Sequence, residues 1–409
     1  MPFEKAGAAA IQLSASGASD ASRSVPEPSD RIESTPVEFT GTGSEYFRIW
    51  IVNLLLIIVT FGIYLPWAKV RKLKYFYNNT HLDGHALDFH GEPKKMLRGT
   101  MIAGVLFVIY NAASNFSATA GLIALALIVA IAPVLFRAAM RFRLANSSWR
   151  GMRMRFTAEG VKGAYGVFLP PILVILVFGA LLGLSGAFAE TPGVGLSGVG
   201  VVFGAGVLMI FATLPYFFWR LKKYQHNHYA WGPLRAEYRS EARSTYQVFG
   251  LTLLLSLLIV LAFVGIIWLA ILGQPASIRN PRGLFAFMSL IVPLFFVFIV
   301  AINILPRAYF TASMQNLLWS RTGNRYFRFK SDLAAPRFIG LQIKNYVLIM
   351  ITFGLYWPFA VINTLRMRLE AVSLKTRIPL DKLTDAARAR ENDAAGDMAA
   401  DIFGLDVGM

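Results

Sequence analysis

The chain has 409 residues, of which 56% are hydrophobic and 15% are charged. Soluble domains carry about 25% charged residues, and several apolar stretches of this chain reach the ~20 residues that cross a bilayer. The composition therefore excludes an ordinary soluble protein and predicts a polytopic membrane protein. The formal net charge is +17, and the absence of cysteine excludes disulfides, iron–sulfur clusters and thiolate catalysis.

The chain is expected to have three parts. Residues 1–38 are rich in Ala, Ser and Pro and contain no apolar run, which predicts a disordered N-terminal tail without a cleavable signal peptide. A membrane domain is predicted at 39–380, followed by a C-terminal tail at 381–409.

Six apolar stretches are long enough to cross a bilayer as helices. They are Thr100–Asn115, Thr119–Phe136, Tyr165–Ala187, Gly193–Phe218, Tyr246–Leu272 and Leu284–Leu305. These spans pair into three hairpins whose short connections carry only two basic residues, Arg279 and Arg282. On the other side, 27 of the 40 Lys and Arg residues fall in four segments, which are 67–99, 134–163, 216–245 and 307–344. This asymmetry predicts that the four basic segments are cytoplasmic.

The four basic segments share an internal spacing. In each, a proline precedes an aromatic residue by 23 positions; the pairs are Pro66 and Phe89, Pro133 and Phe156, Pro215 and Tyr238, and Pro306 and Phe329. A basic stretch with helical periodicity, a glycine and a short alternating run lie between, which predicts an amphipathic interfacial helix, a turn and a strand. The strands 86–89, 152–156, 235–238 and 326–329 are expected to pair into a small cytoplasmic sheet, with 37–40 as a candidate fifth strand.

A second repeat joins the two ends of the membrane domain. Asn53–Ala68 reads NLLLIIVTFGIYLPWA and Asn345–Ala360 reads NYVLIMITFGLYWPFA, with 9 of 16 positions identical. Each copy is about one span long but has a Thr-Phe-Gly break in its middle. Two interpretations remain open: re-entrant hairpins hinged at Gly62 and Gly354 and covered by protein or water, or two ordinary spans of opposite direction, eight in all.

The run EYFRIWIVNLLLIIVTFGIYLPWAKVRKLKYFYNNTHLDG at Glu45–Gly84, followed by FHG at Phe89–Gly91, resembles the signature of the YjgN-like family of bacterial inner-membrane proteins. The resemblance extends more weakly over Val37–Leu380. It implies an inner-membrane location, but this family is a domain of unknown function, so it implies no reaction and no catalytic residues. The final copy has Val-Ile-Asn at 361–363 where the first has Lys-Val-Arg at 69–71, which argues against equal roles for the two ends.

Polar groups at membrane depth are the first candidates for a functional site. The six predicted spans contain no Asp, Glu, Lys, Arg or His, so a carboxylate proton relay is not expected. The two broken end motifs are candidates for a shared polar site, because broken helices bind substrates in many transporters. Its candidate residues are Asn53, Thr60, Gly62, Asn345, Thr352 and Gly354. Hydrogen bonding between helices is the alternative role for these side chains.

The basic stretches are the most repeated chemical feature. The candidate contacts to lipid head groups are Lys69, Arg71, Lys72, Lys74, Arg137, Arg141, Arg143, Arg220, Lys222 and Lys223. Each basic residue near an anionic membrane surface contributes about 1 kcal/mol. Their placement favours anionic membrane lipids as partners and argues against nucleic acid, whereas the alternative role is simply to set the topology.

Together these patterns predict an all-α polytopic membrane protein with six full spans, two terminal re-entrant or spanning motifs, cytoplasmic amphipathic helices and short β-strands. The favoured function is a transporter or channel-like permease for a small or amphipathic solute. The alternative is a non-enzymatic protein that binds anionic lipid or acts as a scaffold. We expect no enzymatic activity, no catalytic residue and no cofactor, because no Ser-His-Asp set, P-loop or carboxylate pair stands out in the sequence. We expect no metal site, because Gly84 separates His81 from His85 and no cysteine joins them.

Overall fold

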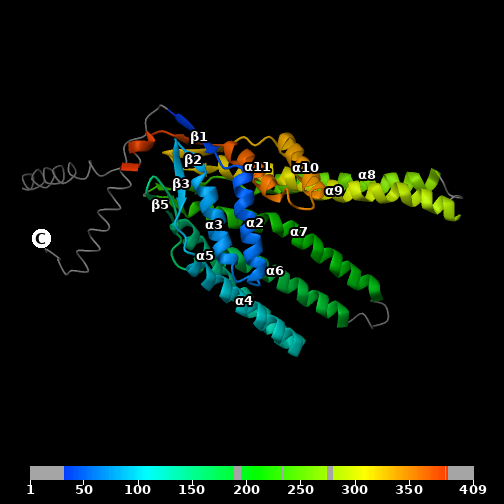
Figure 1. Cartoon of the computed structure of the whole chain (residues 1–409). Coiled ribbons are helices and arrows are strands. Elements are labelled where there is room, and N and C mark those ends of the chain that lie inside the picture. The colour runs from blue at the N-terminus through cyan, green and yellow to red at the C-terminus, as the bar shows by residue number, and fades with distance from the viewer. Residues whose placement is uncertain (1–31, 188–194, 233, 274–279, 383, 386–409) are drawn as a thin grey trace, which may run out of the picture.

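The computed structural model describes residues 32–187, 195–232, 234–273, 280–382 and 384–385. The predicted connection at 188–192 and nearly all of both predicted tails lie outside the described residues. The described chain is mostly helical, and its long helices extend from one side of a β-sheet (Figure 1).

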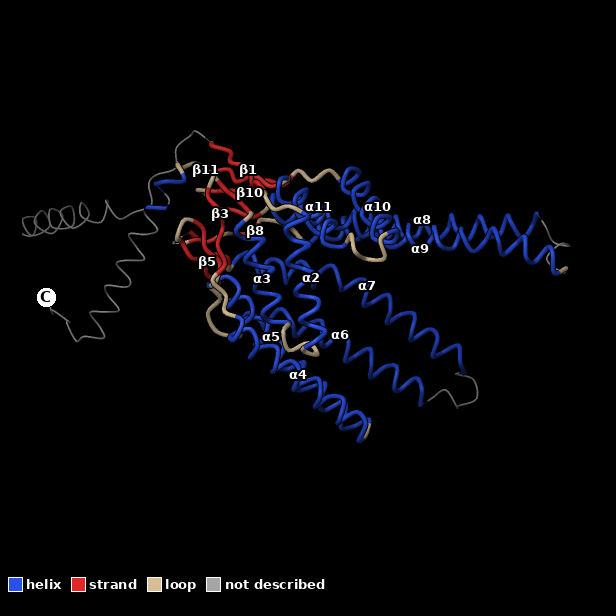
Figure 2. Tube along the Cα trace, viewed as in Figure 1, coloured by secondary structure: helices blue, strands red, loops and turns tan. Residues whose placement is uncertain are grey.

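Three helical hairpins form the largest part of the molecule. Their helices are α4 (Pro93–Phe116), α5 (Ala118–Ala145), α6 (Lys162–Ala187), α7 (Gly195–Asn227), α8 (Ala242–Gly273) and α9 (Pro281–Ser320). All six are long and apolar enough to cross a membrane, which confirms the six predicted spans. The helices of one hairpin pack against each other, as where Phe263 stacks on Phe298 with ring centres 4.1 Å apart. Away from the sheet the hairpins diverge (Figure 2) and leave side chains such as Leu208 and Leu269 exposed, as expected for helices surrounded by lipid.

The separate interfacial helices predicted after the prolines are not present in α5, α7 and α9. Each of these helices continues through its proline, at Pro133, Pro215 and Pro306 respectively. A proline inside a helix removes the N–H donor for the carbonyl four residues before it and distorts that turn, and groups on a neighbouring helix can bond carbonyls of the distorted turn. The Tyr165 hydroxyl donates to the carbonyl of Ala130 at 2.7 Å, three residues before Pro133. The Tyr246 hydroxyl donates in the same way to Ala212, three residues before Pro215.

Each end motif is a pair of shorter helices joined by a tight turn. The pairs are α2 (Gly43–Val59) with α3 (Leu65–Asn78), and α10 (Ala335–Ile351) with α11 (Trp357–Glu370). In the second turn Phe353 has φ 50° and Gly354 has φ 92°, and the first turn has nearly the same angles at Phe61 and Gly62. The Thr352 hydroxyl donates to the carbonyl of Leu348 at 2.7 Å and accepts the next turn's backbone N–H at 3.0 Å. The Thr-Phe-Gly break therefore encodes a reversal of the helix direction.

Both arms of these end hairpins meet the sheet. Strand β1 (Glu33–Phe39) leads into α2, α3 leads into β2 (Thr80–Leu82), and β1 pairs with β2. The hairpin tips lie at the opposite end, where Phe61 and Phe353 are 97% and 98% exposed. Each motif therefore starts and finishes on the same side of the molecule.

The sheet has eleven strands, and every neighbouring pair is antiparallel. The others are β3 (His85–Phe89), β4 (Ser147–Trp149), β5 (Met152–Phe156), β6 (Tyr229–Trp231), β7 (Leu234–Arg235), β8 (Glu237–Tyr238), β9 (Thr322–Gly323), β10 (Phe327–Ser331) and β11 (Val372–Thr376). The order is β7-β6-β5-β4-β3-β2-β1-β11-β10-β9-β8. Only Ala236 separates β7 from β8, the two ends of this order, so one extended stretch pairs with β6 on one side and β9 on the other. The sheet therefore closes into a ring, which leaves no open edge among the described strands.

The predicted strand segments are present, but the small sheet of four or five strands was too simple. The predicted strands do not pair directly with one another; β3 and β5, for example, are joined through β4. The strands that alternate with them are only two or three residues long in four of five cases, too short to show a period of two. The predicted N-terminal tail was also too long, because residues 33–38 belong to β1 and pair with both β11 and β2.

The interior of the strand ring is filled by one apolar cluster, which we call the plug. Its buried members are Trp149, Met152, Leu234, Ala236, Phe327, Leu374, Ile378 and Leu380. These residues come from strands all around the ring, and the last two follow β11. Aromatic contacts cross the ring from Trp149 to Trp231 at 5.0 Å and from Trp231 to Phe327 at 6.3 Å. Because small closed sheets are filled by their inward side chains, the ring is closed at its centre.

Candidate functional site

Five helices end at the strand ring. Each of α3, α5, α7, α9 and α11 leads directly into a strand, so their C-terminal ends lie around the ring. Side chains just after the helices accept or donate bonds that complete these ends. The Asn79 amide donates to the carbonyl of Tyr75 at 2.8 Å, and the Asn146 amide donates to that of Phe142 at 2.7 Å. Such side-chain caps satisfy carbonyls that have no partner within the helix.

A cavity of about 800 Å³ lies where these five helices meet the ring, and we call it the chamber. Residues of all five helices line it together with residues of the ring. Its apolar wall includes Phe76, Phe218, Phe310, Met140, Leu73 and Leu365. Members of the ring such as Trp231, Ala236 and Phe327 also line the chamber, and the plug includes the last two. The plug therefore forms the floor of the chamber on the side of the sheet.

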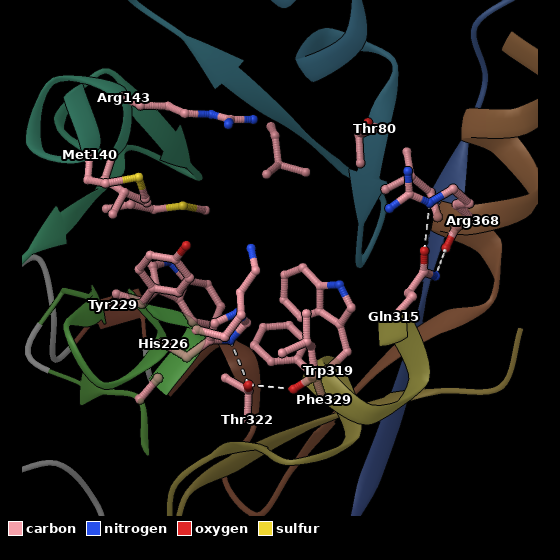
Figure 3. A pocket seen from close by; sticks show the side chains of 18 of the residues that line it. Thr80, Met140, Arg143, His226, Tyr229, Gln315, Trp319, Thr322, Phe329 and Arg368 are labelled. Atoms are coloured by element: carbon pink, nitrogen blue, oxygen red, sulfur yellow. Dashed lines mark hydrogen bonds between the residues drawn. The ribbon is translucent and has the colours of Figure 1, made fainter. Parts of the chain in front are cut away.

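Three cationic side chains line the chamber, and the described lining contains no carboxylate. Arg143 belongs to α5, Lys222 to α7 and Arg368 to α11. Figure 3 shows Arg143 and Arg368 on opposite sides of the chamber. Within the described residues, none of the three forms an ion pair with Asp or Glu. The chamber is thus a positively charged space with mostly apolar walls.

Arg368 is held in place by a reciprocal pair of hydrogen bonds with Gln315 of α9. The Arg368 Nε donates to Gln315 Oε1 at 2.7 Å, and Gln315 Nε2 donates to the Arg368 carbonyl at 2.8 Å (Figure 3). Solvent reaches the guanidinium through the chamber, but burial among protein atoms lowers the pKa of Arg368 below its usual value. An arginine remains protonated at neutral pH after such a shift. Gln315 therefore orients a permanent positive charge.

A buried histidine marks the edge of the chamber next to the ring. His226 Nδ1 and the Thr322 hydroxyl are 2.8 Å apart, and the same hydroxyl donates to the carbonyl of Leu318 at 2.7 Å. The neighbouring ring of Tyr229 lies 5.0 Å from His226, and burial raises the pKa of the Tyr229 phenol, which keeps it neutral. The described residues contain no group of three or more His, Asp or Glu side chains arranged to hold a metal ion.

The C-terminal end of the plug is attached to the ring by an ion pair. Ile378 and Leu380 are buried, and Asp381 Oδ1 lies 2.6 Å from Nη2 of Arg150, in the turn between β4 and β5. The Arg150 guanidinium also lies over the ring of Trp149, 5.3 Å from its centre. The segment after β11 thus packs into the ring instead of leaving it, and the described part of the predicted tail at 381–409 begins at this contact.

The predicted head-group residues fall into three groups. Two of them, Arg143 and Lys222, line the chamber. Others contact protein: Arg137 donates to the carbonyl of Ala158 at 3.2 and 3.0 Å, and three further cations lie over aromatic rings, Lys72, Arg220 and Lys223. The rest are exposed side chains, Lys69, Arg71, Lys74 and Arg141. No lipid contact follows from this geometry alone, and these contacts stay a prediction.

The chamber includes none of the six residues predicted to form a polar site in the end motifs. Thr60 and Thr352 hydroxyls and the two glycines serve the hairpin turns. Asn345 is buried and donates to the Thr364 hydroxyl at 3.2 Å. Asn53 is also buried, and the Oδ1 atoms of both asparagines have no hydrogen-bond partner within the described residues. A shared polar site between them stays a prediction.

Sequence reasoning missed Arg368, Gln315 and the plug. One signal for Arg368 was present: it lies ten residues after Pro358, just as Arg143 lies ten residues after Pro133. Extending the proline spacing to this fifth proline finds Arg368. The plug carried no such signal, because its residues come from short strands that are far apart in the chain.

The comparisons with known proteins place the chain in a family. The model of a bacterial protein family of unknown function, DUF898, matches residues 34–402. The chain belongs to this family. It is 22% identical over 338 residues to inner membrane protein YjgN of Salmonella typhimurium, covering 78% of this chain and 83% of the relative. It is 32% identical to the protein of the same name from Escherichia coli O157:H7 over 151 residues, which span 36% of this chain and only 37% of that relative. No solved structure matches the chain.

Proposed function

We propose that this protein is an inner-membrane permease whose solute passes along the axis of the strand ring. One observation carries the proposal: the chamber lies where five helix ends surround the ring, and a single apolar plug separates it from the far side of the sheet. A polar or amphipathic solute in the chamber would need only the plug to move in order to cross the ring. Hydrophobic constrictions close many membrane pathways in this way.

The proposal includes a direction. The four basic segments, with 27 of the 40 Lys and Arg residues, connect to the strands of the sheet. The positive-inside rule then assigns the sheet and the plug to the cytoplasm. Relatives that are named inner membrane proteins support a location in the inner membrane. The solute enters the chamber from the membrane side and meets the plug at the cytoplasmic side.

The end hairpins are re-entrant in this arrangement. Both arms of each hairpin meet the sheet, and each tip exposes an apolar Phe-Gly turn. Exposure of such a turn to water would be unfavourable, whereas exposure to lipid is not. The 17 residues of α2 give a length of about 25 Å, somewhat less than the ~30 Å hydrocarbon core. Cysteine in place of Ser34 or of its strand partner Lys375 should be protected from an impermeant maleimide in whole spheroplasts and labelled after lysis. Labelling of either in intact spheroplasts would contradict the cytoplasmic sheet.

The permease proposal is tested by weakening the plug. We expect Ile378→Asn with Leu380→Asn to raise chloride flux into proteoliposomes that contain a chloride-sensitive dye, because polar side chains hydrate the constriction. The matched control is Leu333→Asn, which is equally buried but lies in a cluster outside the ring. If the double variant keeps the melting profile of the wild type and conducts no more chloride than the control, the proposal fails.

A milder variant protects the test against misfolding. Asp381→Asn removes only the exposed partner of the Arg150 ion pair and leaves the apolar plug intact. It should raise chloride flux less than the double variant but above the Leu333→Asn control. Unchanged flux in a folded Asp381→Asn variant, together with failure of the double variant to fold, would also count against the permease.

A further inference from the structure

We infer that the chamber binds an anionic amphiphile whose phosphate-type head group lies among the positive charges of Arg143, Lys222 and Arg368. This inference deepens the proposed function by naming the class of solute, and it rests on that function for the site. The three cations come from α5, α7 and α11 and face one space to which no described residue contributes a carboxylate. Lys222 and Arg143 are close enough for their charges to repel each other. A bound anion would relieve this repulsion.

The helix ends do not account for the three cations. A positive charge near a helix C-terminus is favoured by the helix dipole, and Arg143 lies in the last turn of α5. The carbonyls of that turn already have side-chain donors, since Asn146 bonds the Phe142 carbonyl and the Ser147 hydroxyl bonds the Arg143 carbonyl at 2.9 Å. An exposed cation outside the chamber, such as Arg141, would serve the dipole as well.

The three side chains differ in how many of their N–H donors already bond protein atoms. The Arg143 guanidinium makes no hydrogen bond within the described residues, which leaves its planar fork of donors for a ligand. Lys222 Nζ donates to the neutral Gln225 Oε1 at 3.0 Å, which leaves its charge unneutralised. Arg368 is oriented by Gln315 through its Nε, so its terminal amino groups remain for a ligand. Arginine forks match phosphate oxygens in pairs, and a phosphate monoester carries between one and two negative charges near neutral pH.

The walls indicate the rest of the ligand. The aromatic rings of Phe76, Phe218, Phe310, Trp231 and Phe329 line the same chamber as the cations. Apolar walls do not stabilise a small hydrated ion, whereas an alkyl chain that contacts them is removed from water, which lowers the free energy. Three of the helices that line the chamber, α5, α7 and α9, belong to hairpins that diverge away from the sheet (Figure 1), so a chain can extend from the head group toward the bilayer. The arrangement therefore favours a lipid-like phosphate over free phosphate.

The test measures binding directly, without flux. Native mass spectrometry of the full chain in a neutral detergent follows the retention of dodecyl phosphate, with inorganic phosphate as the second probe. We expect dodecyl phosphate to bind, and the triple variant Arg143→Gln, Lys222→Gln, Arg368→Gln to bind it at least about tenfold more weakly. The matched control removes the same charge from three exposed residues that do not line the chamber, Lys94→Gln, Arg98→Gln and Arg337→Gln.

Each result decides the inference. Equal weakening in the chamber variant and the surface control would overturn it, because binding would then follow net charge alone. Binding of inorganic phosphate as tight as that of dodecyl phosphate would overturn the amphiphile and leave a free anion. If the triple variant does not fold, Arg143→Gln alone serves, since its guanidinium bonds none of the described residues, and unchanged binding in it would count as failure. A leaking plug variant without dodecyl phosphate binding would leave the permease standing and refute only this inference.

Discussion

The turn of the second end hairpin gives a prediction whose sign depends on one backbone angle. Gly354 and Gly340 both belong to the α10–α11 hairpin, and a Cβ added at either would meet no atom within 4 Å. Gly354 has φ 92°, whereas Gly340 lies inside α10. Gly354→Ala should lower the free energy of unfolding by about 1–2 kcal/mol, the cost of a left-handed conformation for an L-residue. Gly340→Ala should raise it by about 0.5–1 kcal/mol, because alanine loses less backbone entropy in a helix.

The two variants form a matched pair, because the substitution, the hairpin and the empty surroundings are the same. Equilibrium unfolding by SDS in mixed micelles, followed by circular dichroism, measures both. The two values should differ by about 2 kcal/mol with opposite signs, which combines the two costs above. Two changes of the same sign would refute the reasoning, because packing would then matter more than the backbone angle.

Two further predictions concern the ring and use the same unfolding assay. Leu374→Ala should cost about 2–5 kcal/mol, because Leu374 is completely buried in the plug, whereas Leu355→Ala at an exposed position should cost less than about 0.5 kcal/mol. A small loss for Leu374→Ala would mean that the ring interior is loosely packed. Thr322→Val should cost about 1–3 kcal/mol, because it leaves the buried His226 ring without its partner. Thr311→Val, which loses only a bond within its own helix, is the control, and an equal loss would contradict the role of the His226 contact.

The sequence predicts the spans and the strand segments because both depend on local patterns. Uninterrupted apolar runs identify the six long helices, and the constant distance from each proline to an aromatic residue locates strands such as β5. The same proline was given too much weight as a helix boundary. Pro133 is fully buried inside α5, and Tyr165 from the next helix satisfies a carbonyl that precedes it. That compensation comes from another hairpin and cannot be read from the local sequence.

The chamber could be predicted only in part, for a related physical reason. Arg143 and Lys222 were recognised as basic residues after a span, but nothing in the local sequence separates them from cations outside the chamber such as Arg141. Arg143 and Lys222 differ from such cations because they lie on the side of their helices that lines the chamber. This placement follows from the strand pairing, which joins β5 to β6 and β10 to β11 across long stretches of chain.

The ring also connects the two ends of the chain. Four pairs in the ring, β2–β3, β4–β5, β6–β7 and β9–β10, join strands that follow one another in the chain. Strand β1 instead pairs with β11, through residues more than 330 positions apart. The helices beside it are joined as well, since Phe47 of α2 lies 5.9 Å from Phe359 of α11 and Arg366 donates to the carbonyl of Gly41 at 2.8 Å. Contacts of such high sequence separation form late, and β1 keeps an unpaired edge until β11 has been synthesised. Arg368 lies just before β11, so the third cation and the C-terminal part of the plug (Leu374, Ile378 and Leu380) reach the chamber only in the step that closes the ring. Completion of the ring and completion of the proposed binding site are therefore one event.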